Sequence, residues 1–504
     1  MSGYFSARDR GRKLVLETDV VIVGSGAGGA VVAAELAEAG REVLVLEEGP
    51  RIAPEAYGAM RPAEAIRHAW RDGATTVALG LGNSPSINVT MGRCVGGSSV
   101  LTGGVCFRIP EMVHREWVEE RGLTSLTARD LSPCFEHVES RIHVEEVPQS
   151  MWSNSTRLFA EGAQKCGWPV KPLRRNTNGC RGCGRCNFGC PHQAKRSVDL
   201  SYLPQAVDKG ACVWSHCLIE RLVLKRGRAV GVKGRLLDGK YVRRGSRLEV
   251  RANTVIMAAG AWHTPLILKR SGVGGRLVGR NLTLHPAFKV LARFDEPVEG
   301  WRGALQAAYV DHFEAAGITL VGLFIPPALV GASTPGIGPE HRKHASMAPN
   351  LALFGGIIHD QGGGTIHRSI DREPVVTYRM AARDRARFPT MVRNMAQTFF
   401  AAGAREVFLP IFGMGAVDAD GLAGVDLEHL AMSRVECTSQ HPLGSCQMGT
   451  SPSNSVVDSR GAVWGIDQLY LADGSIVPTS LGVNPQLTVM AMATRVAWGV
   501  RDQS

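Results

Sequence analysis

Four cysteines lie within eleven residues of this chain, at a spacing suited to binding iron. They are Cys180, Cys183, Cys186 and Cys190, and Pro191 follows the last of them. The run matches the CxxCxxCxxxCP pattern by which bacterial-type ferredoxins bind an iron–sulfur cluster through thiolates. Intervening glycines supply backbone freedom, and nearby arginines and lysines would stabilise an anionic cluster. The pattern therefore predicts a 3Fe–4S or 4Fe–4S cluster and one-electron transfer.

Two other interpretations of the cysteine run stay open. Zinc sites usually pair two CxxC knuckles across a longer spacer, which this run lacks. A structural loop without metal also accommodates four cysteines, because thiols serve as core residues in a reducing compartment. The spacing favours the iron–sulfur cluster over both.

A glycine-rich turn near the N-terminus predicts a bound dinucleotide. Residues 18–23 form an apolar run typical of a buried strand, and residues 30–40 read as a helix. A second strand, 41–47, ends at Glu47, an acid placed to accept hydrogen bonds from an adenosine ribose. Between strand and helix the turn holds Gly24, Gly26, Gly28 and Gly29. Such a turn lets the backbone and the helix N-terminus approach a pyrophosphate.

Four further segments carry a family resemblance. They read GRCVGGSSVLTGGVCF from Gly92, GAWHTPLILKRSGVG from Gly260, HPLGSCQMG from His441 and LADGSIVPTSLGVNPQLTVMA from Leu471. Together with the glycine-rich turn, and in this order, they resemble the signatures of the glucose–methanol–choline (GMC) oxidoreductases. The similarity extends over nearly the whole chain. It implies FAD as the dinucleotide and an α/β fold, α+β overall.

The resemblance also implies how the chain is divided. A discontinuous, Rossmann-like FAD-binding domain is expected over residues 16–289 and 431–504, with the cysteine-rich loop 176–198 inside it. Residues 290–430 are expected to form a substrate-binding domain on an antiparallel sheet. Within that domain, 351–360 and 373–380 read as strands and 385–403 as a helix.

Two residues match the catalytic pair of the family. Oxidising an alcohol requires a base near the hydroxyl, and histidine has a suitable pKa near neutral pH. His441, at the start of HPLGSCQMG, matches the family's catalytic histidine, and Asn484, in GVNPQLT, matches the residue that hydrogen-bonds the substrate oxygen. The resemblance therefore implies His441 as the proton acceptor and Asn484 as its partner.

The flavin contacts are carried over in the same way. Thr102 stands where the family usually has asparagine, and Leu101 stands where some members bond FAD covalently through histidine, so non-covalent FAD is expected. The full set of cofactor-binding residues comprises Gly24, Gly26, Gly28, Gly29, Glu47, Gly92, Arg93, Gly96, Gly97, Ser98, Thr102, Ile219, Asp473, Gly474, Asn484, Pro485 and Gln486.

The composition limits which kinds of partner the chain is expected to have. Its 504 residues are 44% hydrophobic and 20% charged, with a formal net charge of +11. No basic stripe with interleaved aromatic residues is present, so nucleic acid is not an expected partner. The N-terminus lacks the apolar run of a secretory signal, which favours a cytoplasmic protein. Prolines and glycines interrupt the longest uncharged stretch, 315–339, which argues against a membrane span but leaves a peripheral membrane contact open.

These features lead to one expected function and two rivals. The first expectation is an FAD-dependent dehydrogenase that oxidises a lipophilic alcohol by hydride transfer to flavin N5. Its electrons would leave through the cluster to a quinone or a protein acceptor. An oxidase that reduces oxygen to hydrogen peroxide is one rival. A redox-neutral lyase is the other, since hydroxynitrile lyases also resemble the family.

Overall fold

The N-terminal part of the chain folds as the predicted βαβ unit. A computed structural model describes residues 2–7, 13–238 and 244–502. Strands β2 (Leu14–Val23) and β3 (Val43–Leu46) pair in parallel, and helix α1 (Ala27–Glu38) connects them. All of β3 is buried, as expected of a strand covered on both faces. Glu47 follows β3 directly and so lies at the carboxyl edge of the sheet, next to the glycine-rich turn.

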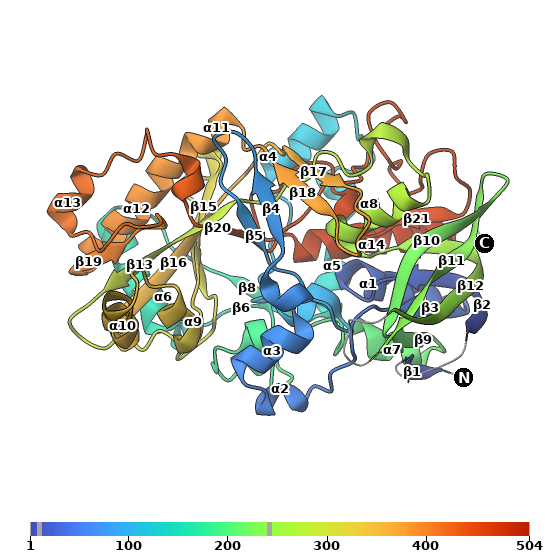
Figure 1. Ribbon diagram of the computed structural model, residues 1–504, viewed down its shortest axis with the longest axis horizontal. Helices are drawn as coiled ribbons and strands as arrows, with labels where there is room; N and C mark the ends of the chain where they lie inside the picture. Colours follow the sequence, from blue (N-terminus) through green and yellow to red (C-terminus); the bar gives the residue numbers. More distant parts are fainter. Residues whose placement is uncertain (1, 8–12, 239–243, 503–504) are drawn as a thin grey trace.

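This unit belongs to the first of two large sheets. Among the described residues the first sheet has eight strands, and Figure 1 shows it on the right, with both chain ends beside it. Its order is β1 (Gly3–Ser6), β9 (Cys212–Ser215), β3, β2, β12 (Arg244–Met257), β11 (Arg228–Leu237) and β10 (Cys217–Lys225), with β21 (Leu469–Leu471) on β12. β11 pairs antiparallel with both β12 and β10, and the other pairs of the sheet are parallel, so the carboxyl ends of the parallel strands meet at one edge.

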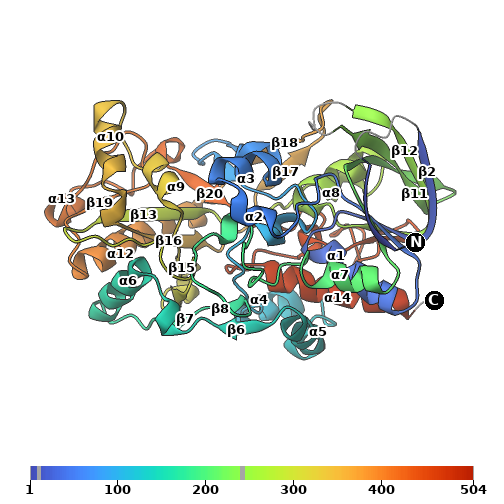
Figure 2. The ribbon, with the colours of Figure 1, turned by 90° about the horizontal axis from the view of Figure 1, so that it is seen from below.

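Helices from distant parts of the chain cover this sheet. α1 packs against α7 (Tyr202–Asp208) and α14 (Gln486–Arg501), and α5 (Ala128–Arg141) packs on α14. Figure 2 shows the four helices on one side of β2, β11 and β12. α1 is apolar around most of its circumference, which suits a helix buried between a sheet and other helices. The C-terminal helix α14 therefore completes a layer begun by the N-terminal unit.

The second sheet is mainly antiparallel and lies beside the first (Figure 1). Its strands come from five regions of the chain, and the parallel pairs are β18 with β4 and β20 with β5. The order is β17 (Gly364–His367), β18 (Val375–Tyr378), β4 (Val77–Gly80), β5 (Ile87–Val89), β20 (Cys437–Ser439), β13 (Ala287–Arg293), β16 (Leu351–Ile358), β15 (Ile318–Gly322), β14 (Ala308–Val310) and β7 (Lys171–Pro172), with β19 (Glu406–Phe408) on β13.

Two helices pack on the second sheet. α6 (Asn154–Lys165) and α12 (Arg387–Ala401) contact each other and strand β16. Phe159 of α6 stacks on Phe354 of β16, with ring centroids 3.4 Å apart, and meets Phe399 of α12 edge-on. The remaining elements are α2 (Ala56–Ala59), α3 (Pro62–Ala69), α4 (Glu111–Arg115), α8 (Gly260–Arg270), α9 (Pro327–Ala332), α10 (Pro339–Ser346), α11 (Ala382–Arg385), α13 (Ala419–Ala423) and the pair β6 (Val144–Glu146) and β8 (Arg174–Asn176).

The architecture confirms the predicted fold class, a Rossmann-like unit joined to a mainly antiparallel sheet. The strands expected in 351–360 and 373–380 and the helix expected near 385–403 are β16, β18 and α12. The second sheet also contains β4, β5, β7 and β20, which lie outside residues 290–430. Segments that the predicted division assigns to the FAD-binding domain thus contribute strands to this sheet. Among the described residues, every helix falls short of the length and apolar character that a membrane-spanning segment needs.

Candidate active site

A cavity of about 350 Å³ opens where the two sheets meet. Its walls come from the carboxyl ends of β2, β3 and β12 on one side and from β13, β15 and β16 on the other. Ligands of open α/β sheets bind at this edge, because strand ends and helix N-termini converge there. Most of the predicted site residues line the cavity: Gly24, Gly26, Gly28, Glu47, Gly92, Gly97, Ser98, Thr102, Ile219, His441, Asp473, Gly474, Asn484, Pro485 and Gln486.

The glycine-rich turn is tight everywhere except at one position. A Cβ added to Gly28 would lie 1.8 Å from the carbonyl oxygen of Ala472, and one added to Gly29 would lie 2.0 Å from that of Gly24. A Cβ on Gly26 would meet no protein atom closer than 4.0 Å. Gly28 and Gly29 thus serve helix packing, whereas the space over Gly26 and the uncapped N-terminus of α1 remain for a ligand.

Two buried carboxylates hold the cavity's backbone in place. Glu47 accepts hydrogen bonds from the hydroxyl (2.7 Å) and N–H (3.1 Å) of Ser25 and from the N–H of Gly49 (2.8 Å). Asp473 accepts from the N–H of Gly260 (2.8 Å) and the hydroxyl of Thr264 (2.5 Å). Burial raises the pKa of both acids, and these hydrogen bonds oppose that effect.

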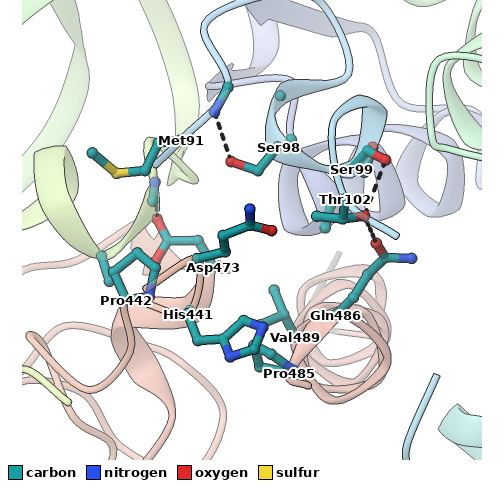
Figure 3. Close-up of a pocket in the computed structure, with 18 of the residues that line it drawn as sticks. Met91, Ser98, Ser99, Thr102, His441, Pro442, Asp473, Pro485, Gln486 and Val489 are labelled. Atoms are coloured by element: carbon teal, nitrogen blue, oxygen red, sulfur yellow. Dashed lines mark hydrogen bonds between the residues drawn. The ribbon is translucent and has the colours of Figure 1, made fainter. Parts of the chain in front are cut away.

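The segment 92–104, here called the flavin loop, faces α14 across the cavity. The N–H of Gly92 donates to the hydroxyl of Ser98 (3.0 Å), and the Thr102 hydroxyl donates to Oε1 of Gln486 (3.0 Å). Figure 3 shows Ser98 and Thr102 on the opposite side of this space from His441. Thr102 thus reaches the start of α14 although it replaces the family's usual asparagine.

Three predicted cofactor residues do not line the cavity. Gly29 packs α1 against the sheet, and Gly96 adopts the left-handed region (φ +93°) and donates its N–H to the Ser25 hydroxyl (3.0 Å). The Arg93 guanidinium lies 3.5 Å from Asp72, among the acidic groups beside the cavity. These residues therefore shape the walls around the cavity.

One end of the cavity holds a cluster of charged side chains that the sequence did not predict. Arg71 is buried and donates to Glu48 (2.7 Å) and to Glu373 (2.8 Å), which also pairs with His263 (2.9 Å). Burial opposes the charge of Arg71, but the two carboxylates hold its pKa above the usual value. Arg372 joins the cluster through Asp72 (2.6 Å). These residues are separated by up to 302 positions, so no local spacing could indicate the cluster.

The two predicted catalytic residues meet at the cavity. Nε2 of His441 lies 3.2 Å from Nδ2 of Asn484. Burial lowers the pKa of His441 well below its usual value, His285 lowers it further, and Asp360 opposes the shift. His441 is therefore neutral at physiological pH, which is the form that a proton acceptor needs.

His285, which the sequence reasoning missed, contacts the other side of the His441 ring. The two Nδ1 atoms are 3.3 Å apart, and Nε2 of His285 accepts from the N–H groups of Leu481 (2.9 Å) and Gly482 (3.1 Å). Burial lowers the pKa of His285 to about 3, with a further contribution from His359. Nδ1 of His441 is thus engaged by a neutral partner, and Nε2 is the nitrogen that faces Asn484.

Asp360 fixes the position of His285. Its carboxylate accepts hydrogen bonds from the N–H groups of Leu284 and His285 (3.1 Å each), from the Tyr378 hydroxyl (2.7 Å) and from the Ser480 hydroxyl (2.9 Å). The donors lie just before β13, in β18 and in the segment that precedes α14. The predicted catalytic His441 therefore contacts a buried polar network that joins His285, through Asp360, to Tyr378 and Ser480.

The structure does not support the predicted iron–sulfur cluster. Across residues 2–7, 13–238 and 244–502, no group of three or more His, Cys, Asp or Glu side chains is arranged to hold a metal ion. Cys186 is buried, Cys183 is exposed, and Cys180 and Cys190 lie between these extremes. Arg175 donates to the Cys186 thiol at 3.0 Å. Burial raises the pKa of this thiol, but Arg175 and Lys195 bring it below the usual value. The Cys186 thiol thus lies against a buried guanidinium.

Family models decide the relationship. The GMC oxidoreductase model matches residues 18–287 with its N-terminal part and residues 364–493 with its C-terminal part. The chain belongs to the GMC oxidoreductase family. A GMC-type oxidoreductase of Mycobacterium tuberculosis is 38% identical over 485 residues, which are 96% of this chain and 76% of that protein. A long-chain-alcohol oxidase of Arabidopsis thaliana is 27% identical over 514 residues, 95% of this chain and 66% of that protein.

Solved structures of GMC enzymes share the fold. Pyridoxine 4-oxidase from Mesorbium loti superposes with a TM-score of 0.73 at 21% identity, covering 96% of this chain and 99% of that one. A formate oxidase gives the same TM-score at 16% identity, with 97% of this chain and 98% of that one covered. At these identities the likeness concerns architecture alone.

The cavity of this GMC oxidoreductase fits FAD, the cofactor of the family. Two buried amide atoms at the start of α14 line it and have no hydrogen-bond partner among the described residues: Oδ1 of Asn484 and Nε2 of Gln486. Unpaired buried polar atoms are rare and point to a missing ligand. Arg270 brings a guanidinium to the same cavity, which suits a pyrophosphate, whereas the charges of Arg71 and Arg372 are balanced by Glu48, Glu373 and Asp72. The turn at Gly26 and the N-terminus of α1 would hold the phosphates.

Proposed function

We propose that this GMC oxidoreductase oxidises the CH–OH group of an alcohol. The observation that carries the proposal is the neutral, desolvated His441 paired with Asn484 in a cavity that fits FAD. In the proposed reaction the Asn484 amide hydrogen-bonds the substrate oxygen, and Nε2 of His441 receives the hydroxyl proton. Bound FAD would supply the acceptor for the hydride that leaves the carbinol carbon.

The cavity wall favours a lipophilic substrate. On the side of the second sheet, the wall includes the apolar side chains of Val321, Leu323 and Ile357. Apolar walls with a few convergent polar groups are typical of sites that bind apolar molecules in a fixed orientation. The similarity to a long-chain-alcohol oxidase agrees with this substrate class.

Anaerobic mixing with alcohols tests the proposal. Primary and secondary alcohols of increasing chain length should bleach the flavin band of the FAD-loaded enzyme in the absence of oxygen. A lyase would show no bleaching with any alcohol, and that result would overturn the proposal.

Oxygen is a second candidate for the final electron acceptor, beside the quinone or protein acceptor. Similarity to an enzyme named an alcohol oxidase favours oxygen, and electron exit through a cluster is not proposed because the cysteines are not arranged to hold one. One hydrogen peroxide formed per alcohol consumed would identify an oxidase. Turnover only after addition of a quinone would identify a dehydrogenase.

The pH dependence of flavin reduction follows from the electrostatics of His441. An imidazole in water loses its base form as the pH falls through about 6.5. Because the pKa of His441 is lowered well below that value, its base form persists to lower pH. We therefore expect the rate constant of anaerobic flavin reduction to stay constant from weakly alkaline to weakly acidic pH. A decline centred near the usual imidazole pKa would show that His441 is not the desolvated proton acceptor.

A further inference from the structure

The segment Cys180–Cys190, here called the cysteine segment, lies between the flavin loop and the second sheet. The N–H of Gly303 donates to the carbonyl of Gly182 (2.9 Å), and Cys183 forms a β-bridge with Gly303. A Cβ added to Gly184 (φ +65°) would lie 2.8 Å from the carbonyl oxygen of Trp301. The cysteine segment is therefore packed directly against residues 301–303, just before the strand β14.

Two buried cations join the cysteine segment to the flavin loop. Arg175, 1% exposed, donates from Nε to the carbonyl of Gly103 (2.7 Å) and from Nη2 to the Cys186 thiol (3.0 Å). Lys195, also 1% exposed, donates to the carbonyls of Val100 (2.6 Å), Thr102 (2.7 Å) and Cys186 (2.9 Å). Five hydrogen bonds from these two buried cations thus fix Cys186 relative to the flavin loop.

The residue after this fixed point lines the cavity. Asn187 is 9% exposed, and its Oδ1 is buried without a hydrogen-bond partner in the described part of the chain. On the cavity wall it lies with Thr102 and Gly103 of the flavin loop and with Gln306 and Leu323 from the side of the second sheet. A buried amide oxygen without a partner on a cavity wall points to a ligand group that completes its hydrogen bonds.

We propose that the cysteine segment is a specificity element of this enzyme: held by Arg175 and Lys195, it presents the Asn187 amide to a second polar group of the substrate. The inference rests on the proposed alcohol oxidation and deepens it. The substrate is then an alcohol with an apolar body and a second hydroxyl away from the reacting carbon. A hydroxyl suits this position because it both donates and accepts, as does the amide.

Paired alcohols and diols test the role of Asn187. The probes are straight-chain primary alcohols from butanol to decanol and the terminal diols of the same lengths, used in anaerobic flavin reduction. For one chain length we expect the wild-type enzyme to bind the diol about tenfold more tightly than the alcohol, the discrimination of one neutral hydrogen bond. In Asn187→Leu, whose new side chain has a similar volume, the diol should bind more weakly, so that the diol and the alcohol bind about equally well.

A matched pair of cysteine variants tests the fixed position of the segment. Cys186→Ala removes the acceptor of Arg175 and should lower the diol preference, whereas Cys183→Ala, at an exposed thiol, should keep it. Cys186→Ser retains an acceptor for Arg175 and should keep part of the diol preference. If Cys186→Ala does not fold, the serine variant replaces it in the comparison with Cys183→Ala. FAD affinity, measured by fluorescence titration, accompanies each variant.

The outcomes separate the two proposals. If no alcohol reduces the flavin of the wild-type enzyme, the proposed function is wrong and the inference falls with it. If alcohols reduce the flavin but no diol is preferred, or Asn187→Leu keeps the preference, only the inference is overturned. If Asn187→Leu weakens FAD binding and slows all substrates equally, the amide serves the cofactor and the inference is again overturned.

Discussion

Replacing His441 by alanine should lower the rate constant of anaerobic flavin reduction by about 10² to 10⁴-fold, the usual contribution of a positioned acid or base. The ring lies 3.2 Å from Asn484 and is kept neutral by its surroundings. His285 cannot take over its task, because Nε2 of that ring already accepts two backbone hydrogen bonds. Stopped-flow mixing of the FAD-loaded variant with a saturating alcohol measures the loss directly.

Two controls separate catalysis from folding in this experiment. His429→Ala changes an exposed histidine outside the cavity and should reduce the flavin at the wild-type rate. The FAD affinity and thermal midpoint of His441→Ala show whether its cavity is intact. A His441→Ala enzyme with bound FAD and a wild-type rate would mean that another group accepts the proton.

Gly28→Ala should prevent the protein from reaching a stable fold. The added Cβ would lie 1.8 Å from the carbonyl oxygen of Ala472, and backbone stands on both sides of the contact. Gly28 belongs to α1, and its backbone packs directly against the backbone of Ala472. Room for a Cβ could arise only if α1 or the segment before Asp473 moved. Overpacking of this kind usually costs about 1 to 3 kcal/mol, and a backbone clash this close should exceed that range. Soluble yield and thermal unfolding measure the effect.

Gly26→Ala, two residues earlier, should act on the cofactor and spare the fold. Gly26 has φ −71°, which alanine adopts readily, and the added methyl meets no protein atom within less than 4.0 Å. It would instead enter the space left for the pyrophosphate. We expect the apoprotein to unfold at the wild-type temperature and the Kd for FAD to rise about tenfold to a hundredfold, which is roughly 1.4 to 2.8 kcal/mol. Wild-type FAD affinity would show that no phosphate approaches this glycine.

Sequence patterns predicted those helices, strands and turns that neighbouring residues alone determine. The glycine-rich turn, α1 and β3 follow from apolar runs and from backbone positions that exclude a Cβ, so sequence alone located Gly24, Gly28 and Glu47. The segments that resemble the family then placed His441 and Asn484 on the same cavity, although 42 residues separate them in sequence. The roles of these residues in catalysis and cofactor binding stay predictions.

The remaining features depend on contacts between distant segments. His285 lies 156 residues from His441, and Arg71 lies 302 residues from Glu373. No spacing rule covers such pairs, because strand order in the second sheet decides which segments meet. The cysteine run raises a related question of how residues are arranged in space. Its spacing is compatible with a cluster, but among the described residues no three metal-ligating side chains come together, so the predicted cluster is not supported.

The contact between His285 and His441 places two demands on one imidazole ring. A neutral His285 whose Nε2 accepts backbone hydrogen bonds carries its proton on Nδ1 and donates it toward Nδ1 of His441. On the other side of the ring, the Asn484 amide nitrogen can only donate, and it lies 3.2 Å from Nε2 of His441. A neutral His441 has one proton and one free lone pair, so it can accept from only one of these two neighbours at a time. The tautomer in which Nε2 is free to accept a proton is therefore the one that gives up the hydrogen bond from His285.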